Sequence, residues 1–89
     1  MLKIDLHGQD KIEAKINMEI FLKECKLKKV KNAMITHGNG KFILRNCVVE
    51  ILQTKSYVES YTFAPPVLGG TGVTVVTFNY QEIKNIKGR

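Results

Sequence analysis

The sequence predicts a two-layer α/β sandwich, in which a four-stranded mixed sheet and two helices follow one another in the order β-α-β-α-β-β. Three observations support this fold class. The 89 residues suffice for one small hydrophobic core but not for two. Short β-branched segments alternate with two longer segments of helical periodicity. No low-complexity stretch divides the chain, so we expect one domain over residues 1–79 and a loosely held basic tail over residues 80–89.

The first strand and the first helix follow from periodicity. Leu2, Ile4 and Leu6 alternate with polar residues and predict a strand over residues 1–6. Asp10 is the predicted N-cap of the helix, with Glu13 completing a capping box. Apolar residues at helical spacing predict its buried face: Ala14, Met18, Phe21, Leu22 and Cys25, widened by Ile12, Ile16 and Ile20.

The remaining elements alternate in the same way. The apolar run from Ala33 to Ile35 suits a central parallel strand. Pro65-Pro66 ends the third strand, because proline has no N–H to donate to a sheet, and a flexible glycine loop follows at residues 69–72. The expected elements are a strand over residues 30–36, a helix over about residues 42–54, and strands over residues 57–64 and 73–78.

The chain is strongly basic. Fourteen Lys and Arg against eight Asp and Glu give a net charge of +6, which favours a polyanionic partner such as nucleic acid, although a solvated surface is the simpler explanation. Five lysines crowd the end of the first helix, where they suit the helix dipole or could contact phosphate: Lys23, Lys26, Lys28, Lys29 and Lys31.

Neither cysteine has the spacing of a metal site, so we expect Cys25 and Cys47 to be buried thiols. No secretory segment and no run of transmembrane length is visible in the sequence. We therefore expect a cytoplasmic protein without a membrane partner.

Both histidines of the chain precede a glycine, and they lie thirty residues apart, at His7 and His37. This is about the length of one β-α-β unit, so they should emerge at the same edge of neighbouring parallel strands, where ligands bind in open α/β sheets. Glycines at such an edge let backbone amides approach an anion, beside a helix N-terminus. The predicted phosphate-binding residues are Gly8, Gly38, Asn39, Gly40 and Lys41.

Phosphodiester cleavage requires proton transfer and positive charge, and four residues could supply them. His7 is the first candidate for acid–base chemistry, and Asp5 could orient its imidazole, act as a base or hold a metal. His37 is either a second acid–base group or a residue that positions the loop. Arg45 could offset developing charge. The structural alternatives are that the histidines merely cap loops and that Asp5 pairs with a backbone amide or a lysine.

Three blocks of sequence resemble the Smr (small MutS-related) domain family. Ile4-Asp5-Leu6-His7-Gly8 resembles the opening block, and His37-Gly38-Asn39-Gly40 with the later Leu44-Arg45 resembles the central one. Residues 69–76, which read Gly-Gly-Thr-Gly-Val-Thr-Val-Val, resemble the closing block. The resemblance implies a fold similar to the C-terminal domain of bacterial translation initiation factor three. It also implies an endonuclease that nicks DNA or cleaves RNA, including messenger on ribosomes.

The chain departs from the family at one place, and the departure leaves two functions open. The central block of the family usually continues with Thr-Gly, where this chain has Lys41-Phe42. Asp5 and His7 favour an endonuclease, whereas the lost glycine favours a non-catalytic module that binds nucleic acid or the ribosome. A site for a phosphorylated metabolite is a third alternative. We expect no tightly bound cofactor or metal, although cleavage of DNA would call for a divalent ion.

Overall fold

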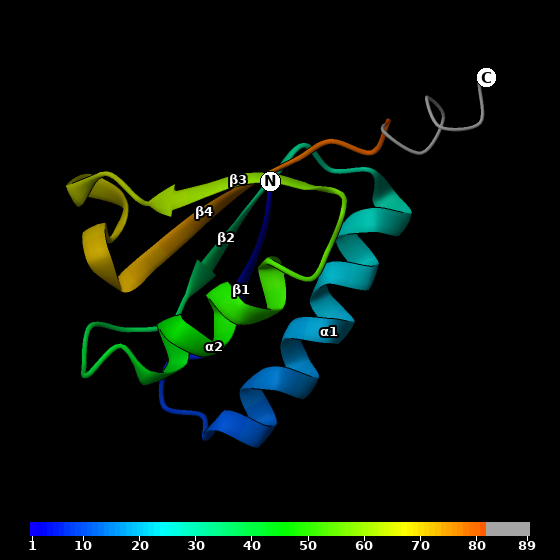
Figure 1. Ribbon diagram of the computed structural model, residues 1–89. Helices are drawn as coiled ribbons and strands as arrows, with labels where there is room; N and C mark the ends of the chain where they lie inside the picture. The colour runs from blue at the N-terminus through cyan, green and yellow to red at the C-terminus, as the bar shows by residue number, and fades with distance from the viewer. Residues whose placement is uncertain (82–89) are drawn as a thin grey trace.

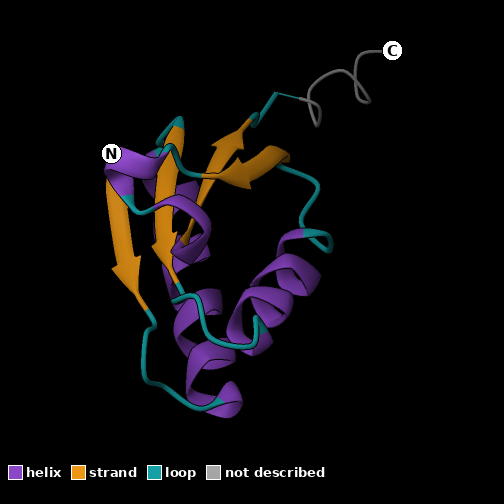
Figure 2. Ribbon diagram, turned by 90° about the vertical axis from the view of Figure 1, so that its left-hand side faces the viewer, coloured by secondary structure: helices purple, strands orange, loops and turns teal. Residues whose placement is uncertain are grey.

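The computed structural model describes residues 1–81 and shows a four-stranded mixed sheet with both helices on one face (Figures 1 and 2). The fold class and the element order predicted from the sequence are confirmed. The elements are β1 (Leu2–Asp5), α1 (Lys11–Lys28), β2 (Asn32–Thr36), α2 (Ile43–Leu52), β3 (Val58–Phe63) and β4 (Val73–Phe78). Two short 3-10 turns lie between β3 and β4, namely η1 (Pro66–Leu68) and η2 (Gly70–Gly72), and the second falls within the glycine loop predicted at residues 69–72.

The order of the strands brings three loops together at one end of the sheet, where β1 and β2 end and β4 begins. The strands lie in the order β1-β2-β4-β3, with β1 parallel to β2 and with β4 antiparallel to both of its neighbours. Asp5 of β1 is paired with Thr36 of β2, and Thr36 is paired with Val73 at the start of β4. The two His-Gly segments therefore leave the sheet at the same edge, as predicted, and the glycine-rich turn enters β4 there.

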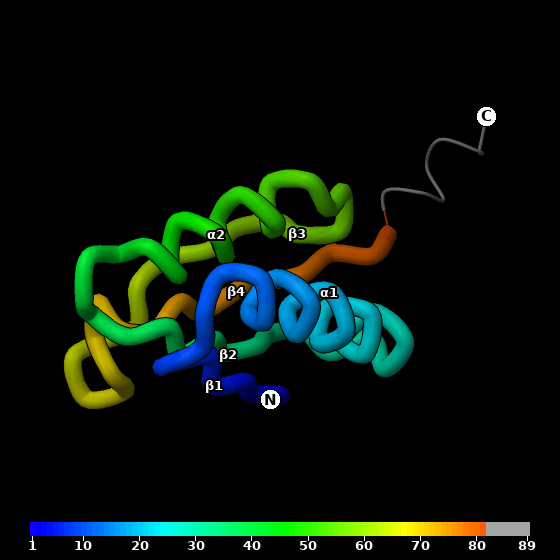
Figure 3. The backbone as a smooth tube through the Cα atoms, turned by 90° about the horizontal axis from the view of Figure 1, so that it is seen from below, coloured from blue at the N-terminus to red at the C-terminus, as the bar shows by residue number. Residues whose placement is uncertain are grey.

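The core lies between the sheet and the two helices, which run side by side (Figure 3). The predicted buried face of α1 is confirmed at Ala14, Met18, Phe21, Leu22 and Cys25. The prediction that three isoleucines widen this buried face was wrong. The exposed fractions of Ile12, Ile16 and Ile20 are 73%, 56% and 63%. These three isoleucines lie on the opposite side of the helix, and in a two-layer fold that side has no second sheet to cover it.

Both ends of α1 are fixed by hydrogen bonds. Asp10 and Glu13 form the predicted capping box, with the Glu13 amide donating to Asp10 Oδ1 over 2.8 Å. At the other end, the Tyr80 hydroxyl donates to the carbonyls of Cys25, at 3.2 Å, and Val30, at 2.8 Å. The predicted tail began at residue 80, so its first residue is in fact packed against the core. Residues 82–89 of this tail lie outside the described part of the chain.

The two thiols match their prediction, because Cys25 and Cys47 are buried and form no disulfide. Within residues 1–81, neither helix is long and apolar enough to cross a membrane.

Candidate functional site

A pocket of about 280 Å³ opens where the loops after β1 and β2 meet the start of α2. It contains both histidines and all five of the predicted phosphate-binding residues. We refer to it as the histidine pocket. Its lining consists of His7, Gly8, His37, Gly38, Asn39, Gly40, Lys41, Phe42, Ile43 and Leu44. The predicted residues Asp5 and Arg45 are not part of this lining.

His7 stands in a turn beyond β1 and is exposed. The strand ends at Asp5, one residue earlier than predicted, so His7 does not continue its alternation. The carboxylate of Asp5 instead accepts a hydrogen bond from the His7 backbone amide over 2.9 Å, which is the structural alternative that the sequence left open. The His7 imidazole makes no hydrogen bond to any residue of the described range, so both of its nitrogens are open to a ligand.

His37 is only 5% exposed, and both of its ring nitrogens have partners. Nδ1 lies 3.0 Å from the Gly38 carbonyl, and Nε2 lies 2.7 Å from Thr74 Oγ1. Because a carbonyl oxygen can only accept, Nδ1 carries the proton, and the Thr74 hydroxyl then donates to Nε2. Burial lowers the pKa of His37 below its usual 6.5, and the positive charge of Arg45 lowers it further, against the opposing effect of the Gly38 hydrogen bond. The neutral form is therefore the one that the fold favours.

The glycine-rich turn before β4 holds the loop after β2. The carbonyl of Gly72 accepts hydrogen bonds from the amides of His37 and Gly38, both over 3.0 Å. The Thr71 hydroxyl donates to Asn39 Oδ1 over 2.9 Å. Gly38 lines the histidine pocket, but its amide already donates to the Gly72 carbonyl. The prediction that this amide binds phosphate is therefore corrected.

Sequence reasoning missed the partners that hold this loop, namely Thr71, Gly72 and Thr74. The sequence carried one signal for Thr74, namely a hydroxyl within its most strongly β-forming segment. The structure shows that this residue is fully buried, and a buried hydroxyl requires a hydrogen-bond partner. Its partner could not be read from the chain, since His37 lies 37 residues away and the contact depends on β4 being next to β2.

Phe42 occupies the position at which the resembling family usually has glycine, and its backbone is left-handed, with φ of 61°. Such a conformation costs a residue with a side chain about 1–2 kcal/mol. The Phe42 ring packs near Phe63, with 6.3 Å between ring centroids, and this contact offsets part of the strain. The backbone at residue 42 therefore has the left-handed conformation that glycine adopts readily, although the residue is phenylalanine.

Arg45 is directed to β3 rather than to the histidine pocket. Its guanidinium lies over the ring of Phe63, with the central carbon 4.4 Å from the centroid. Its Nε is buried and has no hydrogen-bond partner within residues 1–81. Arg45 therefore lies outside the lining of the histidine pocket, although its charge is near enough to His37 to lower the pKa of that residue.

The histidine pocket thus combines one open imidazole, the cation of Lys41, and the start of α2, which has no side-chain cap. Such a combination suits an anion, because the first amides of a helix lack intrahelical partners. No three His, Cys, Asp or Glu side chains come together as metal ligands in the described part of the chain.

Comparison with known proteins gives a consistent match. The family model for the Smr domain matches residues 4–79. Endonuclease MutS2 of Streptococcus pneumoniae strain Taiwan19F-14 is 36% identical over 76 residues, which are 85% of this chain and 10% of that protein. The same protein from strain Hungary19A-6 is 34% identical over the same length. The chain thus spans about a tenth of these curated relatives.

Two solved structures share the fold. The Smr domain of Thermus thermophilus MutS2 gives a TM-score of 0.84 at 34% identity, covering 90% of this chain and 100% of that one. YdaL, a stand-alone small MutS-related protein from Escherichia coli, gives a TM-score of 0.84 at 25% identity, covering 88% of this chain and 64% of that one.

Proposed function

The chain belongs to the Smr domain family, and from this premise we propose that it is a nucleic-acid endonuclease whose histidine pocket binds the phosphate at the bond to be cut. The observation that carries the proposal is the open imidazole of His7, which lies in the pocket beside Lys41 and the start of α2. The relatives named as endonucleases support the same reaction class.

The two histidines receive different roles in this proposal. His7 exchanges protons with the substrate, because histidine is the side chain that can do so near neutral pH and its ring is accessible. His37 is a positioning residue, because both of its nitrogens are engaged and burial favours its neutral form. Asp5 is also a positioning residue, since its carboxylate fixes the backbone of the turn that presents His7.

With RNA, the substrate supplies its own nucleophile, so a metal ion is optional. The 2′-oxygen of the substrate forms a bond to phosphorus and gives its proton to a base, while the bond from phosphorus to the 5′-oxygen breaks. A proton is then delivered to that 5′-oxygen, and the other product carries a cyclic phosphate. His7 takes part in one of these proton transfers, and Lys41 offsets the charge on the phosphate.

DNA has no 2′-hydroxyl, so water must be the nucleophile. For that substrate we retain the prediction of a divalent ion, which lowers the pKa of a bound water. The ribosome as a partner and a cytoplasmic location also remain predictions from the sequence.

A binding module without catalysis is the second candidate, and one observation favours it. Arg45, the residue predicted to offset developing charge, packs on Phe63 outside the histidine pocket. His7 and Lys41 would then contact a phosphate that is held but not cut.

The deciding experiment is cleavage of labelled RNA and DNA by the purified domain, with and without EDTA. We expect cleavage by the wild-type chain and none by His7→Ala, which should retain salt-sensitive binding. Cyclic-phosphate ends in EDTA would identify the RNA reaction, and metal-dependent cutting of DNA alone would identify the hydrolytic one. Binding of either substrate without any cutting would reject the endonuclease and leave the binding module.

A further inference from the structure

Two further hollows lie along α1, one beside the start of α2 and the other beside the loop that follows α2. The first, of about 850 Å³, includes Lys11 and Lys15 and shares Ile43 and Leu44 with the histidine pocket. The second, of about 600 Å³, begins one helical turn beyond Lys15 at Glu19. We refer to the lining of these two hollows together as the α1–α2 crease.

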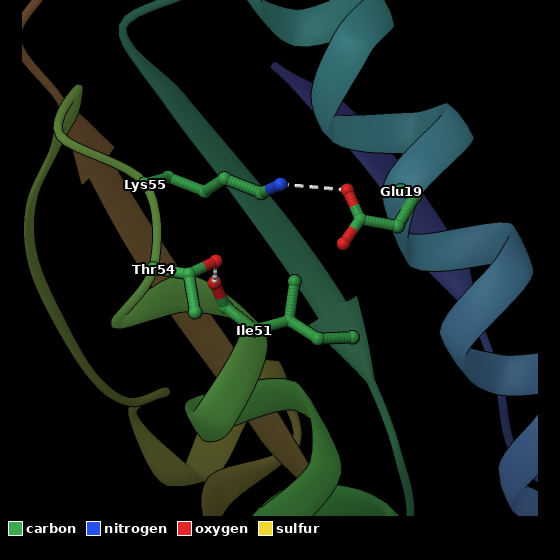
Figure 4. A network of polar contacts seen from close by, with 4 residues as sticks. All are labelled: Glu19, Ile51, Thr54 and Lys55. Carbon is green, nitrogen blue, oxygen red and sulfur yellow. Dashed lines mark hydrogen bonds and ion pairs between the residues drawn. The ribbon is translucent and has the colours of Figure 1, made fainter.

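The α1–α2 crease is lined by lysines along its whole length: Lys11, Lys15, Lys23, Lys26, Lys29 and Lys55. The carboxylates that line it are both engaged. Asp10 accepts from the Glu13 amide in the helix cap, and Glu19 pairs with Lys55 over 2.7 Å (Figure 4). Apart from Lys55, no lysine of the crease forms an ion pair within residues 1–81. The crease therefore keeps a net positive charge.

The lysines also have a defined spatial arrangement. Lys11 and Lys15 line the hollow beside the start of α2, and Lys26 lines the hollow beside the loop after α2, so the three lysines follow the axis of α1. At the far end, the ammonium groups of Lys26 and Lys29 stand 5.1 Å from the ring centroids of Tyr57 and Tyr80. From Lys11 to Lys29 the helix rises about 27 Å. The charges form a track that begins at the histidine pocket and ends at the opposite end of α1.

We propose that the α1–α2 crease holds the sugar-phosphate backbone of the nucleic acid whose reacting phosphate lies in the histidine pocket. The inference rests on the proposed function, and it adds a second contact region that the reaction itself does not require. The first hollow shares Ile43 and Leu44 with the histidine pocket, and lysines recur along α1 from there, which favours a polyanion that extends from the pocket. Tyr57, the aromatic residue that lines the crease, is buried in the core, so the contact is to backbone and is independent of base sequence.

The length of the track predicts a length dependence of binding. A duplex rises about 3.4 Å per base pair, so a track of about 27 Å corresponds to about 8 base pairs. A shorter duplex can fill the histidine pocket but cannot reach the far lysines. An acidic polypeptide is the competing occupant, because it could also pair with lysines in a groove between helices.

The test uses labelled DNA and RNA hairpins with stems of about 4 and about 16 base pairs, which fall on either side of the length of the track. Lys15→Gln with Lys23→Gln removes two charges from the crease. Lys3→Gln with Lys28→Gln removes two charges elsewhere, on β1 and on the last turn of α1. Affinity is measured across a salt series for both hairpins, polyglutamate is measured in parallel, and circular dichroism verifies that all variants are folded.

We expect the crease variant to weaken the long hairpin about tenfold and to lower its salt slope by about 2. The short hairpin reaches Lys15 but not Lys23, so its salt slope should fall by only about 1, and the control variant should change little for either hairpin. Equal effects of the two variants on the long hairpin would overturn the inference and leave the proposed function standing. Polyglutamate binding that depends on Lys15 and Lys23, with unchanged hairpin binding, would assign the crease to an acidic polypeptide. If the wild-type chain bound no hairpin at low salt, the proposed function would fail and the inference with it.

Discussion

The imidazole of His7 lies against the backbone of Gly38, so closely that a methyl group on the Gly38 Cα would stand 3.2 Å from His7 Cδ2. Two neighbouring parallel strands deliver these residues to the same edge of the sheet. The contact means that the loop after β2 helps to set the position of the His7 ring. Glycine is required at residue 38 both for this approach and for its φ of +87°.

A matched pair of alanine variants separates these two requirements. Gly8 has a φ of +88°, but a methyl group there would meet nothing within 4 Å. Both Gly38→Ala and Gly8→Ala should therefore lose about 1–2 kcal/mol of stability through backbone strain. Only Gly38→Ala should also displace His7 and reduce cleavage by tenfold or more relative to Gly8→Ala. Chemical denaturation and cleavage rates test this, and equal losses of activity would contradict the role of the contact.

Replacement of Thr74 by valine should destabilise the chain by about 1–3 kcal/mol, because it leaves His37 Nε2 buried without a partner. The shape of the side chain is nearly conserved, so the effect reports the lost hydroxyl. Thr62→Val on the exposed side of β3 is the control and should change stability little. Denaturation midpoints provide the measurement. A Thr74→Val chain as stable as the control would show that Nε2 finds another partner.

The stability of the chain should fall as the pH drops below about 6.5, the usual pKa of histidine. The pKa of His37 is lowered in the folded state, so below this pH the unfolded chain binds a proton that the folded chain resists. The contribution of His37 to the free energy of unfolding is therefore complete above the pKa that this residue has in the unfolded chain. It declines as the pH falls towards the lower pKa that His37 has in the folded chain. His37→Gln should flatten this dependence, whereas His7→Gln should retain it. An unchanged pH profile in His37→Gln would refute the assignment.

The hydroxyl of Tyr80 should contribute about 1 kcal/mol to stability, because it donates to two carbonyls near the end of α1. Burial raises the pKa of Tyr80 to about 12, so the group stays protonated and able to donate at neutral pH. Tyr80→Phe tests this contribution. Tyr61→Phe, which removes a bond accepted from Gln53 at an exposed site, should cost less. Equal unfolding free energies for the two variants would place Tyr80 outside the cooperative fold.

Local sequence patterns were sufficient to predict the fold, because each element has its own period or its own boundary signal. Asp10 and Glu13 marked the start of α1, and the proline pair marked the end of β3. Periodicity could not indicate how many layers cover a helix, so the isoleucines at residues 12, 16 and 20 were assigned to the core although they are exposed.

The position of the candidate site could be predicted from the sequence, but the contacts between its residues could not. Two His-Gly segments one β-α-β unit apart placed the histidines at a common edge, which the pairing of β1 with β2 confirms. The difference between them depends on tertiary contacts, since Thr74 and Gly72 engage His37 and its loop, whereas no residue of the range 1–81 forms a hydrogen bond with the His7 ring. Those contacts depend on the strand order, which local patterns do not determine.

The position of β4 has a consequence for the order in which the pocket forms during synthesis. The last strand of the described chain lies inside the sheet, between β2 and β3, and it brings both Gly72 and Thr74 to the loop that carries His37. A growing chain therefore exposes both histidines well before their loops are fixed. We therefore expect the loop that carries His37 to become fixed only once β4 has joined the sheet, because Gly72 and Thr74 supply its hydrogen bonds.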